Sequence, residues 1–145
     1  MHKFPFSKDE WDEIVDISCD MVNFLEREDE DSPELFTKFL DIINKLENKY
    51  GRHPVLLETL ADFTDEPKVC KKLYTEALEI AKKHGLPSIS IRNTFANLLI
   101  EDFQDYSMAL QILQAGDKEI KKHDDKYNIE QYFKLKRKLT IKLCN

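Results

Sequence analysis

The chain has 145 residues, 34% of them charged, and a net charge of −6. This length suits a single domain, and three glycines and five prolines are too few for an all-β or a disordered chain. No run of 18 apolar residues is present, so we expect no transmembrane helix, and the N-terminus lacks the apolar core of a signal peptide. The sequence therefore predicts an all-α protein that stays in the cytoplasm.

Charge is distributed unevenly along the chain. Between Asp9 and Glu34 twelve acids stand against one base, a local charge of −11, whereas residues 126–145 carry six bases and one acid, a charge of +5. An acidic end repels phosphate, so we expect no general binding of nucleic acid. The weaker alternative is a nucleic-acid role for the basic C-terminal segment, whose aromatic residues we expect to pack inward.

The first predicted helix covers about residues 7–28. Ser7 and Glu10 have the spacing of a capping box, which typically opens a helix. The apolar stripe that follows has helical spacing and comprises Trp11, Ile14, Val15, Ser18, Met21, Val22 and Leu25. The opposite face is acidic, and we expect it to contact a partner through Asp9, Asp12, Glu13, Asp16 and Asp20.

Proline and glycine mark the boundaries of the next three helices. Pro33, Pro54 and Pro67 each stand where a first helical residue is expected, and Gly85 follows two lysines and a histidine, as at a helix C-terminus. Three more helices are then expected, which start near Ser88, Asp105 and Asp125. This makes seven in all: three hairpins and a terminal helix.

Parts of the sequence recur with a period near 34. Gly51 and Gly85 are 34 positions apart, and Ala61 and Ala96, each preceded by a large apolar residue, are 35 apart. A period of this length built from helix pairs indicates a helical solenoid.

Residues 33–125 resemble tetratricopeptide (TPR) repeats. The resemblance is carried by Leu60-Ala61, Cys70, Tyr74 and Ala77, and in the next unit by Phe95-Ala96, Tyr106, Ala109, Leu113 and Gly116. It implies a right-handed solenoid of helical hairpins with about seven antiparallel helices. Within this single domain, residues 1–32 would be an acidic N-terminal helix and linker, and residues 126–145 a basic capping helix.

The resemblance also implies that the first helix of each pair lines a concave groove. By helical spacing, one unit would turn Glu58, Asp62 and Asp65 toward that groove, and the next would add Asn93, Asn97 and Glu101. An ordinary solvated helix face is the other interpretation of the same residues. If the groove is functional, its acidic and amide side chains favour a basic protein partner.

Nothing in the sequence indicates catalysis, a cofactor or a metal. The three cysteines are widely spaced, and we expect Cys19 and Cys70 at or beside core positions. The four histidines stand at a terminus or at helix ends, and no glycine-rich loop could hold a phosphate. We therefore expect a protein that binds a partner and is no enzyme.

The chain is also similar in style to small bacterial immunity proteins that accompany secreted polymorphic toxins. The similarity is carried by residues 4–11 (FPFSKDEW) and 53–65 (HPVLLETLADFTD). It implies an antitoxin that neutralises a cognate toxin, here a basic one, in a 1:1 complex of two monomers without nucleic acid or membrane. The alternative is a TPR-type adaptor or chaperone that binds an extended or helical peptide.

Overall fold

The computed structural model describes residues 1–26, 33–123 and 125–144. Every regular element in these residues is a helix, which confirms the all-α prediction. None of these helices is long and apolar enough to cross a lipid bilayer. In chain order they are α1 (Lys8–Glu26), α2 (Pro33–Tyr50), α3 (Pro54–Asp62), α4 (Pro67–His84), α5 (Ile89–Glu101), α6 (Tyr106–Gln114), α7 (Asp117–Ile120) and α8 (Lys126–Cys144).

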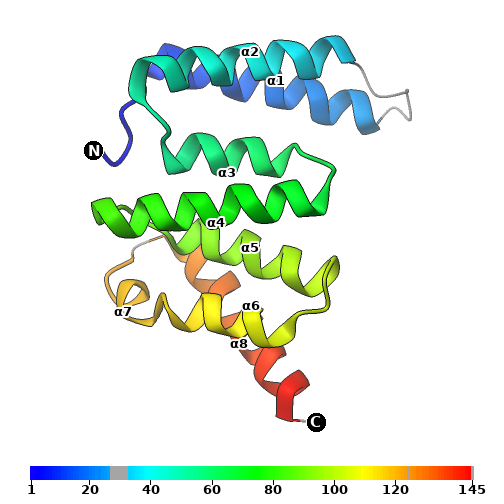
Figure 1. Cartoon of the computed structure of the whole chain (residues 1–145), viewed down its shortest axis with the longest axis vertical. Coiled ribbons are helices and arrows are strands. Elements are labelled where there is room, and N and C mark those ends of the chain that lie inside the picture. The colour runs from blue at the N-terminus through cyan, green and yellow to red at the C-terminus, as the bar shows by residue number, and fades with distance from the viewer. Residues whose placement is uncertain (27–32, 124, 145) are drawn as a thin grey trace.

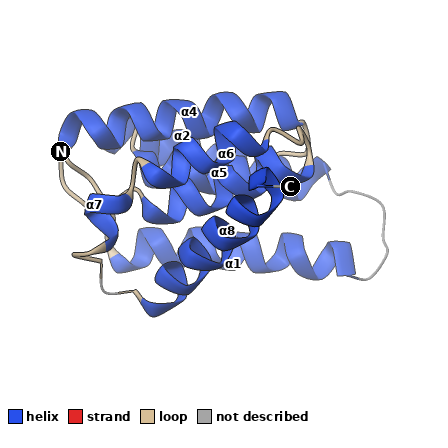
Figure 2. Ribbon diagram, turned by 90° about the horizontal axis from the view of Figure 1, so that it is seen from below, coloured by secondary structure: helices blue, strands red, loops and turns tan. Residues whose placement is uncertain are grey.

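Helices that follow one another in the chain pack as pairs: α1 with α2, α3 with α4, and α5 with α6. The pairs are stacked along the long axis of the molecule, with α1 and α2 at one end (Figure 1). At the other end, α8 packs against both α5 and α6 and crosses the other long helices obliquely (Figure 2). The first and last helices of the chain therefore lie at opposite ends of the stack.

The boundaries expected from proline and glycine agree with the structure. Pro33, Pro54 and Pro67 are the first residues of α2, α3 and α4, because a first helical residue needs no free N–H. Gly85 ends α4 at a φ of 64°, in the left-handed region where only glycine is free of strain. The acidic linker expected before residue 33 lies outside the described residues.

The capping box of α1 is also confirmed. The Ser7 N–H donates to Glu10 Oε1 at 2.9 Å, and the Glu10 N–H donates to Ser7 Oγ at 3.2 Å. Lys49 and Tyr50 of α2 donate to the same carboxylate at 2.8 and 2.5 Å. These donors, Lys49 first, lower the pKa of Glu10 to about 2. Glu10 thus joins α1 to the end of α2.

The sixth predicted helix is broken in two, so the described residues hold eight helices where seven were expected. The break lies at Gly116, whose N–H bonds back to the Leu113 carbonyl at 2.8 Å in a tighter turn. A Cβ at this position would lie 2.9 Å from Arg92 Cδ and 3.1 Å from Ile89 Cδ1. The chain therefore turns where glycine allows it to approach α5 closely.

The apolar residues form two buried clusters that meet at α3. The cluster at the N-terminal end comprises Phe6, Ile14, Ile17, Phe39, Ile43, Leu46 and Leu56. The larger cluster joins α3 to α8, and its residue Phe95 stacks on Tyr74 with ring centroids 5.7 Å apart. Leu57 of α3 belongs to this second cluster, so α3 connects the end pair to the rest of the core.

Several residues expected to be inside are exposed on the two terminal helices. On α1, Val15, Cys19 and Val22 face solvent, and on α8 so do Tyr127 and Phe133. The reason is the same at both ends. A helix at the end of a stack has neighbours on one side only, so its buried stripe is narrower than the apolar pattern in its sequence.

The histidine that caps α3 should make the fold sensitive to acid. His53 is 1% exposed; its Nδ1 accepts from the Val55 N–H at 3.1 Å, and its Nε2 lies 2.8 Å from the His2 carbonyl oxygen. Nδ1 can accept only in the neutral ring, and the contact with the His2 carbonyl oxygen then puts the proton on Nε2. Burial, the main cause, lowers the pKa of His53 below its ordinary value of 6.5.

His53 therefore binds a proton more readily in the unfolded chain than in the folded one. As a result, stability should fall as the pH drops below about 6.5. His53→Asn keeps a capping acceptor but does not titrate. We expect thermal melts between about pH 5 and 7.5 to show a shallower acid loss for this variant than for the parent. Parallel losses in the two proteins would contradict the assignment.

Candidate functional site

Two carboxylates on α3 lie one turn apart, and each is held by a neighbouring helix. Ser90 Oγ of α5 donates to Glu58 Oε1 at 2.5 Å, and the Tyr74 hydroxyl of α4 donates to Asp62 Oδ1 at 2.7 Å. We refer to these four residues as the acidic seam. Both donors come from helices that follow α3 in the stack, α4 and α5, so both carboxylates have fixed positions.

The surrounding protein raises the pKa of both carboxyl groups. Burial, opposed by the Ser90 hydrogen bond and reinforced by the charge of Asp62, raises the pKa of Glu58 to about 7. The protein around Asp62 also raises its pKa, with the Tyr74 hydrogen bond acting in the opposite direction, although Asp62 itself is exposed. In the part of the chain that the structure describes, no lysine or arginine pairs with either group. The acidic seam therefore pairs a partly buried carboxylate, Glu58, with an exposed one, Asp62, and the described residues supply no cation to either.

The turn after the acidic seam presents the third predicted acid of α3. Asp65 is exposed between α3 and α4. The turn is held by Cys70, whose buried thiol donates to the Thr64 carbonyl at 3.0 Å and lies 3.4 Å from that of Ala61. Burial raises the pKa of this thiol. The core position expected for Cys70 is confirmed, and its contacts are structural.

The acids of α1 lie apart from the acidic seam, on the helix pair at the end of the stack (Figure 1). All five predicted residues are exposed: Asp9, Asp12, Glu13, Asp16 and Asp20. Lys8 Nζ pairs with Asp12 Oδ2 at 2.9 Å, and both side chains are largely in solvent, where such a pair adds little to stability. This face keeps a strong negative charge.

The three predicted residues of α5 occupy different environments. Asn97 is exposed, but Asn93 is only 5% exposed, and its Nδ2 donates to the Asn128 carbonyl at 2.9 Å. Asn93 therefore anchors α8 and does not lie with the acidic seam on an open surface. The sequence pattern put it on an open face because α8, far along the chain, covers this part of α5.

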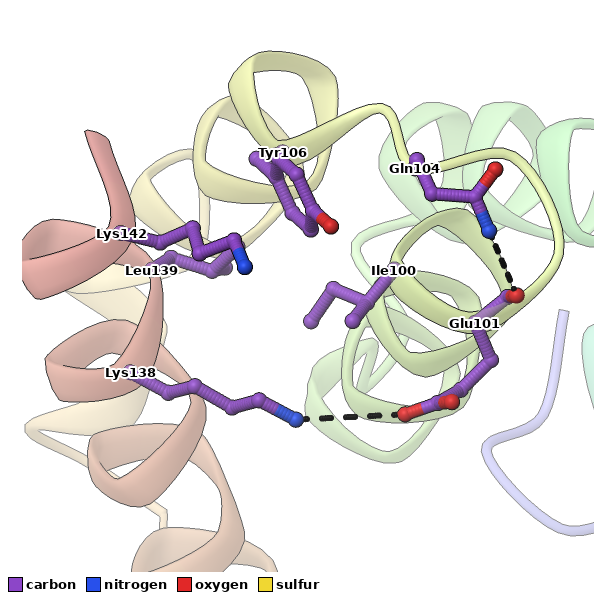
Figure 3. A pocket seen from close by; sticks show the side chains of 7 residues that line it. All are labelled: Ile100, Glu101, Gln104, Tyr106, Lys138, Leu139 and Lys142. Carbon is purple, nitrogen blue, oxygen red and sulfur yellow. Dashed lines mark hydrogen bonds and ion pairs between the residues drawn. The ribbon is translucent and has the colours of Figure 1, made fainter. Parts of the chain in front are cut away.

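Glu101, the third α5 residue, lines a pocket of about 280 Å³ between α5, α6 and α8 (Figure 3). Lys138 Nζ lies 3.9 Å from Glu101 Oε1, and Gln104 Nε2 donates to the Glu101 carbonyl at 3.0 Å. Lys142 Nζ stands 5.1 Å from the ring centroid of Tyr106. The pocket is completed by Ile100 and Leu139.

The pocket combines apolar side chains with two ammonium groups, so it could accept part of a peptide or a small amphipathic ligand. Sequence reasoning missed its basic side, because Lys138 and Lys142 come from α8 and meet Glu101 only through the tertiary fold. The one signal available was their four-residue spacing, which puts both on one helix face.

The described residues contain no group of three histidine, cysteine or acidic side chains that could hold a metal ion. Burial raises the pKa values of two hydrogen-bonded carboxylates, the tyrosine that donates to one of them, and a buried thiol. The arrangement offers charge and hydrogen-bond acceptors for recognition. Comparison with protein-family models, with curated proteins and with solved structures found no match.

Proposed function

We propose that the chain is an immunity protein: a solenoid of TPR-like helical hairpins that binds a basic toxin and occludes its active or substrate-binding surface. It would act in the cytoplasm, as one partner of a 1:1 complex, without chemistry of its own. The observation that carries the proposal is the acidic seam, in which a partly buried and an exposed carboxylate are held in place and lack a cation within the described chain.

A cation from a partner would pair with the negative charge of these two carboxylates. Glu58 and Asp62 are already fixed by Ser90 and Tyr74, so little side-chain entropy is lost when a lysine or arginine approaches. A charge-assisted hydrogen bond in such a partly dry site is stronger than one in open water. The acids of α1 add a long-range field that attracts a basic protein and speeds its association.

A second candidate function is an adaptor that binds a peptide, and the pocket at Glu101 favours it. A cavity of about 280 Å³ with Ile100 and Leu139 beside two lysines could receive one side chain and an acidic group of a peptide. The two functions differ in affinity and range. An immunity protein should bind one partner with a Kd near 1 nM, about −12 kcal/mol, whereas an adaptor should bind several peptides weakly.

The test is genetic and then kinetic. The product of the adjacent open reading frame is expressed in a host with and without this chain, and the chain should restore growth. The purified pair should form a 1:1 complex with nanomolar affinity. Neutralising the α3 acids by Glu58→Gln, Asp62→Asn and Asp65→Asn should slow association roughly tenfold at low salt and flatten its salt dependence.

The matched control is Glu34→Gln, Asp41→Asn and Glu79→Gln, which makes the same number of acid-to-amide replacements at exposed positions on α2 and α4. This control should change the association rate much less than the α3 variant does. Equal effects would show that only net charge matters and would contradict a role for the acidic seam. A neighbouring product that is harmless, or that does not bind, would refute the immunity function.

A further inference from the structure

The helix pair at one end of the stack carries an acidic surface interrupted by apolar side chains. On α1, Asp16 and Asp20 are exposed, and neither makes an ion pair within the described residues. Val15 and Val22 lie beside them with exposed fractions of 43% and 44%. We call these four residues the α1 face. Val15 and Val22 belong to the apolar stripe predicted to be buried, but α2, the helix that packs against α1, does not cover them.

The other end carries the opposite charge in a similar arrangement. On α8, Phe133 and Ile141 are 52% and 58% exposed. Lys134 and Arg137, between them in sequence, are exposed and form no ion pair in the described part of the chain. We call these four residues the α8 face. It lies on the side of α8 away from the buried residues that pack against α5 and α6.

We infer that the α8 face of one copy of this chain docks on the α1 face of a second copy. The charges are complementary: two adjacent acids on one face and two adjacent bases on the other. Each face also presents two large apolar side chains, which gain by leaving water together. Both helices have 19 residues, and helices of this length can pack side by side. The two faces lie on helices at opposite ends of the molecule (Figure 1), so each copy can use both in contacts with other copies.

The contact joins unlike faces, so it produces dimers with two equivalent contacts or longer head-to-tail chains. A single helix-on-helix contact is smaller than a standard stable interface, and we expect a Kd of roughly 10 µM to 1 mM. The inference uses this chain's own surfaces and does not depend on a toxin. If a toxin binds the acids of α1, it should compete with this self-association.

The experiment is sedimentation of the full chain at about 0.3 mM in about 20 mM salt, where the Debye length is roughly 20 Å. The weight-average mass should exceed that of one chain and rise with concentration. It should return to the mass of one chain in about 0.5 M salt, because exposed charges are then screened. A mass of one chain under all conditions would overturn the proposal.

Two charge-reversed variants test which faces meet. Asp16→Lys/Asp20→Lys makes the α1 face basic like the α8 face, and Lys134→Glu/Arg137→Glu makes the α8 face acidic like the α1 face. Each variant alone should remain a single chain. An equimolar mixture of the two should associate again, because every contact in it joins opposite charges. A mixture that stays monomeric, or single variants that still associate, would place the contact elsewhere.

The matched control is Lys68→Glu/Lys72→Glu, the same change of charge at exposed positions on α4, which should self-associate like the parent. A second variant, Phe133→Ser/Ile141→Ser, tests the apolar part without any change of charge and should weaken association at least tenfold. Helical circular dichroism verifies that each variant is folded. Retained association in this apolar variant would also contradict docking through the α8 face.

Discussion

Replacement of Phe95 by alanine is expected to lower the free energy of unfolding by about 3–5 kcal/mol, the range for a large aromatic residue removed from a core. Phe95 is 1% exposed and belongs to the larger buried cluster. Its ring stacks on that of Tyr74 at 5.7 Å between centroids, a contact that adds to the area buried. A small domain is stable by only about 5–15 kcal/mol, so this variant should be close to unfolding at room temperature.

The chain contains a control of identical chemistry. Phe133 is 52% exposed on α8, so Phe133→Ala should change stability by no more than about 0.5 kcal/mol in dilute protein. Urea titrations of both variants and the parent, monitored by helical circular dichroism, measure the difference directly. Equal midpoints for Phe95→Ala and the parent would show that this residue is not in the core. The buried packing of α4 against α5 would then be incorrect.

The sequence predicted the ends of helices well, because the signals for them are local. The prolines that start α2, α3 and α4, and the glycine that ends α4, act through their own backbone preferences and need no distant partner. The break after α6 was missed for the opposite reason. Gly116 permits close contact with Arg92, 24 positions earlier, and nothing within one helix indicates such a contact.

The same distinction explains which site residues could be predicted. The spacing of Glu58 and Asp62 on one face of α3 is a local property, and the structure has them side by side. Their donors, Ser90 and Tyr74, come from other helices, so neither the hydrogen bonds nor the raised pKa values were accessible from spacing. Asn93 has the right spacing as well, but α8 covers it. Periodicity predicts which residues share a face, whereas tertiary packing decides whether that face is open.

The second large effect concerns the pH dependence of stability. The pKa of Glu58 is raised from its ordinary value of 4.5 to about 7 by burial. Between these two pH values, the folded chain keeps a proton that the unfolded chain releases. Stability should therefore fall as the pH rises from about 4.5 to 7, and the loss should be complete above pH 7. His53 acts in the opposite direction over part of this range, so the parent's own pH profile does not isolate Glu58.

Glu58→Gln isolates it, because glutamine is always neutral and its side-chain oxygen can still accept from Ser90. Each unit of pKa shift corresponds to about 1.4 kcal/mol; since Glu58 is partly accessible to solvent, we expect the variant to be more stable than the parent by roughly 1–3 kcal/mol at about pH 8. Near pH 4.5 the two should differ little.

Denaturant titrations across this range measure the difference, with Glu79→Gln at an exposed position of α4 as the control. Absence of a gain at pH 8 would show that Glu58 is ionised in the folded protein without cost, and an equally large gain at pH 4.5 would show that the gain does not come from its ionisation. Glu58 would then no longer be a desolvated carboxylate in need of a cation.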